Sequence, residues 1–144
     1  MTAEQYLRQL KNIRKRITNK RRDAVMWRDI AENMGGSIGE ADKVQKTQTQ
    51  SRMADAIGKA IDYERDADML AEKLVDLQYT IICQIDGMGN TDEGLILSEL
   101  YVHGISMTQI SHEWNCTYRH LERVKKRALH IFTEKYGRNF KKNL

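Results

Sequence analysis

Apolar residues in the first part of the chain recur in alternating steps of four and three, the heptad pattern that keeps one side of an α-helix apolar. This spacing predicts one helix over residues 1–34, with a capping box of Thr2 and Gln5 at its start and Gly35-Gly36 at its end. The stripe consists of Tyr6, Leu10, Ile13, Ile17, Ala24, Trp27, Ala31 and Met34, and Lys20 is its one polar interruption.

A second stripe with the same spacing predicts a helix over residues 51–86, after a small and polar connector over residues 35–50. The two helices predict an antiparallel, coiled-coil-like hairpin over residues 1–86. A hairpin buries little by itself, so we expect it to pack against the rest of the chain or to form a homodimer or higher oligomer. The second stripe consists of Ala56, Ala60, Tyr63, Ala67, Leu70, Leu74, Leu77 and Ile81.

Charge is distributed unevenly along the chain, and it supports this pairing. Residues 1–34 carry nine Lys and Arg against four Asp and Glu, whereas residues 35–86 carry six against ten. A basic helix beside an acidic one determines that these two helices pair with each other, and in which register. It adds little stability, because exposed ion pairs contribute only about 0–1 kcal/mol each.

The remaining residues, 87–144, predict a C-terminal domain of three helices, which makes the fold all-α. The first of these helices is expected over residues 91–103, with a capping box of Asn90 and Glu93 and an end at His103-Gly104.

A helix-turn-helix is predicted after this first helix. A short helix over residues 107–114 has Ser106 as its N-cap, Asn115-Cys116 forms a tight turn, and a longer helix over residues 118–135 has Thr117 as its N-cap. This succession places the second helix of such a motif in the major groove of DNA. The residues expected to face inward are Ile110, Trp114, Cys116, Leu121, Val124, Ala128, Leu129, Ile131 and Phe132.

The outward face of helix 118–135 is basic, and residues 117–144 hold nine Lys and Arg against two Asp and Glu. Arginine can bond guanine through two hydrogen bonds, and both basic side chains suit phosphate. The predicted base contacts are Thr117, Tyr118, Arg119, Glu122 and Arg123. The predicted phosphate contacts are Lys125, Lys126, Arg127 and Arg138, with Lys141 and Lys142 in the tail. Double-stranded DNA is therefore the expected partner.

Several classes of protein do not fit the sequence. No apolar run approaches the roughly 18 residues that a membrane span needs, and no phosphate-binding loop or catalytic grouping is present. Two cysteines make neither a disulfide framework nor a metal knuckle. The spacing of His112, Cys116 and His120 is broken by the predicted turn, so we expect no metal. We expect a cytoplasmic protein that is not an enzyme and needs no cofactor.

Residues 104–129 resemble region 4 of bacterial sigma factors, which continues from a Gly-x-Ser turn into a helix, a small turn and a basic helix. The matching positions are Gly104-x-Ser106, Gln109-Ile110-Ser111, Thr117 and Arg127-Ala128-Leu129. Departures from that pattern are Gln109 for Glu, Ser111 for Ala and Trp114-Asn115 for Leu-Gly.

The layout of the whole chain resembles the small phage and prophage regulators of the ArpU and RinA type. That resemblance is specific only in residues 92–132, because a helical hairpin carries little information. It implies an activator of phage late genes that binds promoter DNA in the cytoplasm of a bacterial host and contacts RNA polymerase.

Two other functions fit the same pattern. Small terminase subunits of phages also join a helix-turn-helix to an oligomerising helical segment, and would act in DNA packaging. A sigma-like module could instead bind RNA polymerase without contacting DNA. The apolar spacing does not distinguish the two, because any cluster of three helices shows similar spacing.

Overall fold

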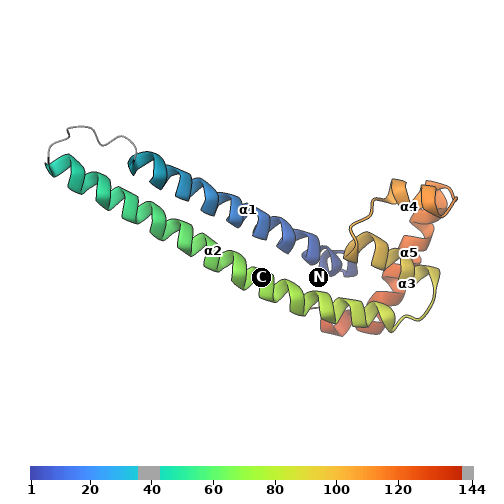
Figure 1. Cartoon of the computed structure of the whole chain (residues 1–144). Coiled ribbons are helices and arrows are strands. Elements are labelled where there is room, and N and C mark those ends of the chain that lie inside the picture. Colours follow the sequence, from blue (N-terminus) through green and yellow to red (C-terminus); the bar gives the residue numbers. More distant parts are fainter. Residues whose placement is uncertain (36–42, 141–144) are drawn as a thin grey trace. The chain divides into compact units, whose positions relative to one another are not determined.

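The protein is all-α in the computed structural model, which describes residues 1–35 and 43–140 (Figure 1). Five α-helices follow one another in these ranges, and no strand occurs among them. They are α1 (Ala3–Gly35), α2 (Lys43–Asp86), α3 (Asp92–Leu97), α4 (Met107–Glu113) and α5 (Tyr118–Tyr136). A π-helical turn, η1 (Ser98–Val102), follows α3, and a 3₁₀ turn, η2 (Gly137–Asn139), follows α5. Among the described helices, none combines the length and the apolar character that a membrane span requires.

The helix α1 begins as its sequence predicts. The backbone N–H of Gln5 donates to the Thr2 hydroxyl at 3.2 Å, and the N–H of Thr2 donates to the Gln5 side chain at 3.0 Å, so both halves of the capping box form. The helix ends at Gly35, whereas Gly36 lies outside the described residues.

The predicted connector is wrong over its second half, because α2 begins at Lys43 instead of residue 51. Residues 43–50 lack an apolar stripe, which is why periodicity gives no helix there. Lys and Gln nevertheless have high helix propensity. Extending an existing helix also needs no new nucleation, so about two polar turns can precede the packed part of α2.

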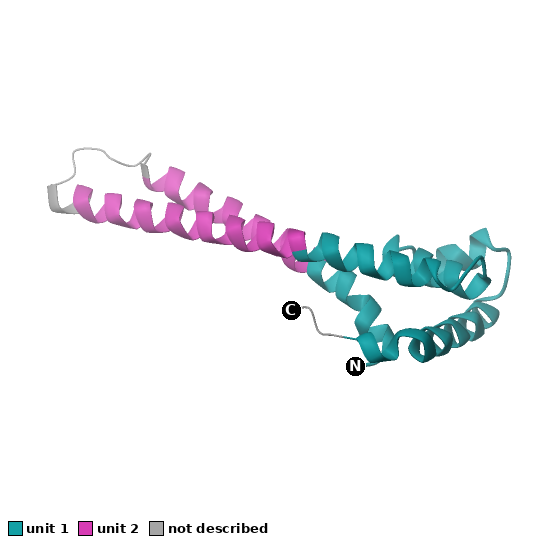
Figure 2. Ribbon diagram, turned by 90° about the horizontal axis from the view of Figure 1, so that it is seen from below, with its two compact units in different colours: residues 1–13, 73–144 teal, residues 14–72 magenta. Residues whose placement is uncertain are grey.

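Contacts divide the chain into two compact units, shown in different colours in Figure 2. Unit 2 is Arg14–Glu72 and consists of parts of α1 and α2 that run antiparallel. Arg28 bonds Glu64 through two hydrogen bonds of 2.8 and 3.0 Å, and the ammonium of Lys20 lies 3.4 Å from the Asp66 carboxylate. Alanines fill most of its interior: Ala24, Ala31, Ala56, Ala60 and Ala67 are buried.

Unit 1 is Met1–Ile13 together with Lys73–Leu144, so the predicted boundary between residues 86 and 87 lies inside it. The first turns of α1 and the last turns of α2 pack with the C-terminal helices of the same chain. The ring of Tyr6 in α1 lies 6.1 Å from that of Phe132 in α5, and its hydroxyl donates to the Gln84 side chain of α2 at 3.1 Å. Burial raises the pKa of Tyr6.

The segment after α2 differs from its prediction in two details. Thr91, and not Asn90, is the N-cap of α3, because its hydroxyl accepts from the N–H of Gly94 at 3.1 Å. The expected single helix over residues 91–103 changes after Leu97 into the π-helical turn η1, where the N–H of His103 reaches the carbonyl of Ser98. Gly104 then has φ +70°, a left-handed conformation that glycine adopts without strain.

Candidate nucleic-acid interface

Local capping interactions determine where α4 and α5 begin and how the turn between them is formed. The hydroxyls of Ser106 and Thr117 accept from the N–H groups of Gln109 and His120, both at 3.2 Å, so each helix begins at its predicted N-cap. Asn115 in the turn has φ 50°, the left-handed conformation that asparagine tolerates better than most residues. The Ser111 hydroxyl donates to the carbonyl of Cys116 at 2.7 Å and fixes the turn against α4.

One face of α5 is buried among apolar side chains. Leu121, Val124, Ala128 and Phe132 are at most 2% exposed, and Ile110 of α4 is fully buried. Trp114, Cys116 and Leu129 are half-buried. Ile131 is 40% exposed, so its expected inward position is wrong. It follows Val124 by seven residues and Ala128 by three, so it stands at the edge of this face and not at its centre, and is open to solvent there.

The opposite face of α5 carries a row of free cations. Arg119, Arg123 and Lys126 lie at i, i+4 and i+7 on this face, and all three are exposed. Within the part of the chain that the structure describes, none of the three forms an ion pair or a hydrogen bond through its side chain. We call these three residues the exposed row. Glu122 is exposed as well, and Tyr118 at the start of the helix is 48% exposed.

Two of the predicted phosphate contacts lie on the flanks of α5 and already have partners. The ammonium of Lys125 is 3.2 Å from the Glu4 carboxylate in the first turn of α1, and only 26% of the Lys125 side chain is exposed. The guanidinium of Arg127 is 3.6 Å from the carboxylate of Glu93 in α3. These pairs join α5 to a helix on either side and distinguish Lys125 and Arg127 from the exposed row.

Sequence reasoning missed the roles of Glu4 and Glu93, because each carboxylate pairs with a cation far away in the sequence. From the sequence, Glu93 is expected only as part of a capping box with Asn90. Glu4 stands 121 positions from Lys125 and also pairs with Arg8 at 2.7 Å. Its carboxylate lies close enough to Tyr101 to matter electrostatically: burial raises the pKa of Tyr101, and the charge of Glu4 adds to that rise.

The remaining predicted cations are in the C-terminal tail. Arg138 is exposed in the 3₁₀ turn η2, next to the end of α5. Lys141 and Lys142 lie outside the described residues. The tail is held to α5 through Phe140, whose ring stacks on Tyr6 at 4.7 Å and on Phe132 at 5.7 Å.

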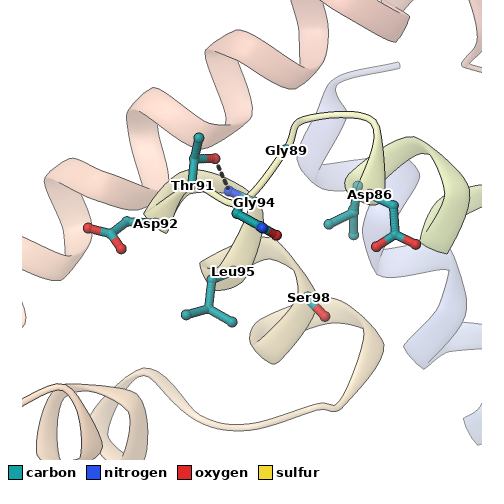
Figure 3. A pocket seen from close by; sticks show the side chains of 9 residues that line it. Asp86, Gly89, Thr91, Asp92, Gly94, Leu95 and Ser98 are labelled. Carbon is teal, nitrogen blue, oxygen red and sulfur yellow. Dashed lines mark hydrogen bonds between the residues drawn. The ribbon is translucent and has the colours of Figure 1, made fainter.

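A cavity of about 460 Å³ lies elsewhere in unit 1, between the end of α2, the loop that follows it and α3 (Figure 3). Asp86 and Asp92 line it from two sides, and Ile85 and Leu95 supply its apolar wall. In the described ranges no group of three or more His, Cys, Asp or Glu is placed to hold a metal ion.

Comparisons of the chain with models of protein families, with curated proteins and with solved structures give no match. The geometry of the α4–α5 segment and its charges therefore carry the functional argument.

Proposed function

We propose that the chain is a sequence-specific DNA-binding transcription regulator, in which α4, the turn at Asn115 and α5 act as a helix-turn-helix with α5 in the major groove. The observation that carries this proposal is the exposed row. Three cations that have no partner among the described residues follow one face of a helix whose opposite face is buried, so that this face is both rigid and free to bind an anion. Helix-turn-helix proteins contact base edges with the N-terminal part of the second helix.

The base contacts in this proposal come from the first turns of α5. Arg119 and Arg123 are exposed and unpaired in the described residues, and arginine can bond guanine through two hydrogen bonds. Tyr118 and Glu122 lie beside them on the surface. The hydroxyl of Thr117 caps α5, so its methyl group is the part best suited to a thymine methyl.

The phosphate contacts in this proposal are Lys126 and Arg138, which are exposed. We assign a positioning role to Lys125 and Arg127 instead, because their pairs with Glu4 and Glu93 link α5 to α1 and to α3. A cation paired with a carboxylate must give up that partner before it can bind phosphate, which offsets part of the gain.

The biological role rests on the resemblance to small phage regulators. We propose an activator of phage late genes that binds as a homodimer or higher oligomer through the N-terminal hairpin and contacts host RNA polymerase. Helix-turn-helix dimers bind two half-sites about 34–36 Å apart, or a multiple of that distance. The spacing of half-sites in a selected DNA therefore reports the oligomer.

The proposal is tested by selecting duplexes from a random pool with the full chain at moderate salt and sequencing them. The wild type should enrich a motif that an Arg119→Ala/Arg123→Ala double variant loses, since a good bidentate contact contributes about 1–3 kcal/mol of base discrimination. Arg65→Ala is the matched control, because it removes an exposed arginine of α2 that belongs to none of the proposed DNA contacts. No enrichment by the wild type would move the assignment to a polymerase-binding module. Ring-shaped oligomers in light scattering would move it to DNA packaging.

Two adjacent lysines allow a second test on the same DNA. Lys126→Ala should weaken binding to selected and random duplexes alike and lower the slope of log K against log salt by about one. Lys125→Ala should leave that slope unchanged, because its ammonium is held by Glu4. Equal loss of slope in both variants would show that Lys125 contacts phosphate and that its assignment as a positioning residue is wrong.

A further inference from the structure

A second apolar stripe lies on the part of α2 that belongs to unit 1. Val75, Tyr79 and Ile82 follow one another at i, i+4 and i+7, and they are 63%, 74% and 40% exposed. The face that packs inside unit 1 carries Leu77 and Ile81, which are at most 3% exposed. This helix therefore has one apolar face that is covered and another that nothing in the described chain covers.

Carboxylates lie beside this stripe and at its C-terminal end. Asp86 lies four residues after Ile82 on the same face of α2, and it also lines the cavity shown in Figure 3. The far side of the cavity presents Asp92 and Leu95, and Leu95 is 48% exposed. Asp76 is exposed beside Val75. Among the described residues, none of these three carboxylates forms an ion pair.

We propose that this acidic apolar surface, made by Val75, Tyr79, Ile82 and Asp86 with the cavity beside it, binds a basic amphipathic helix of a partner protein. Large exposed apolar side chains in one patch mark an interaction site more often than scattered ones do. An amphipathic helix places apolar anchors at i, i+4 and i+7 against such a stripe, and its Lys or Arg side chains reach the free carboxylates.

Charge selects this occupant over two others. DNA is repelled by Asp76, Asp86 and Asp92, so this surface is distinct from the exposed row of α5. A second copy of the same surface would bring the carboxylates that border the two stripes close to one another, and like charges disfavour that pairing. The inference does not depend on DNA binding, and its test uses no DNA.

The experiment measures binding of three synthetic 18-residue peptides to the full chain by fluorescence anisotropy. The first peptide is an amphipathic helix with a leucine stripe and lysines, the second has glutamates in place of the lysines, and the third has the composition of the first with the stripe scrambled. We expect the first to bind at least about tenfold more tightly than either control, with an affinity that falls as salt is raised.

Variants of the surface complete the test. Tyr79→Ser should weaken the first peptide about tenfold or more, because a large aromatic anchor at the centre of an interface contributes most of its energy. Asp86→Lys should weaken it and reduce the salt dependence. Met69→Ser is the matched control, since Met69 lies on α2, is 60% exposed and is off the stripe.

Equal binding of the three peptides, or equal effects of Tyr79→Ser and Met69→Ser, would overturn the proposal. So would a dimer in sedimentation that Tyr79→Ser dissociates, which would make a second copy the occupant.

Discussion

Unit 1 and unit 2 both contain parts of α1 and α2, yet they bury different kinds of side chain. In unit 1 the buried positions of these helices are large, among them Leu7, Leu10, Ile13 and Ile81. In unit 2 they are mostly alanines, and the large residues Trp27, Tyr63 and Leu70 are only half-buried. The same heptad spacing thus gives a well-filled core in one unit and a thin interface in the other.

Polar contacts accompany the thin interface of unit 2. The ammonium of Lys59 lies 4.3 Å from the centre of the Trp27 ring, and that of Lys20 lies 4.8 Å from the centre of the Tyr63 ring. Such contacts contribute about 0.5–1 kcal/mol each at exposed sites. Burying a Leu or Phe contributes about 1.5–3 kcal/mol. We therefore expect unit 2 to open at a lower free energy than unit 1, which holds α5 in place.

The largest expected effect is in the core of unit 1. Phe132 is fully buried in α5, and its ring lies 5.1 Å from Tyr136 and 5.7 Å from Phe140. Phe132→Ala should lower the free energy of unfolding by about 3–5 kcal/mol, because it leaves a cavity among these rings. Urea unfolding followed by circular dichroism measures this loss.

The control is Ile131→Ala, one position along and 40% exposed, which should lower the free energy of unfolding far less. Similar losses in both variants would show that α5 is not held by this core.

The outcome at these positions shows what sequence patterns can predict. Helix starts at Thr2, Ser106 and Thr117 follow from the capping residue and the few positions after it, so the sequence predicts them correctly. The buried face of α5 likewise follows from its period. Both are local properties of a helix.

Other features depend on what lies beside a helix, which periodicity does not contain. Lys125 and Lys126 are neighbours in sequence with the same side chain, but one meets Glu4 and the other is exposed. Only the packing of α1 against α5 separates them. The heptad steps of α2 likewise predict only the face that carries Leu77 and Ile81, and they give no sign of the stripe of Val75, Tyr79 and Ile82 on the other face.

A smaller effect is expected from overpacking the interface of unit 2. Ala60 is fully buried there, so Ala60→Leu should force α1 and α2 apart and cost about 1–3 kcal/mol. Amide hydrogen exchange should speed up over Arg14–Glu72 while the amides of α5 keep their protection, if the two units open separately. Ala54→Leu makes the same change at an exposed position of α2 and should leave exchange unaltered. Loss of protection in α5 as well would mean that the units open together.

The smallest effect concerns the pH dependence of the pair between Arg28 and Glu64. The hydrogen bonds from Arg28 lower the pKa of Glu64 in the folded chain. A carboxyl whose pKa is lower in the folded state stabilises that state above its unfolded pKa, and the contribution is lost as the pH falls through the folded pKa. Acidification from about pH 6 to about pH 3 should therefore lower the melting temperature of the wild type more than that of Glu64→Gln, which lacks the titrating group. Asp68→Asn removes an exposed carboxylate of α2 that forms no ion pair among the described residues, so its acid response should match the wild type. If Glu64→Gln responds to acid as the wild type does, this pair does not stabilise unit 2, and the alanine packing and the remaining polar contacts hold its thin interface.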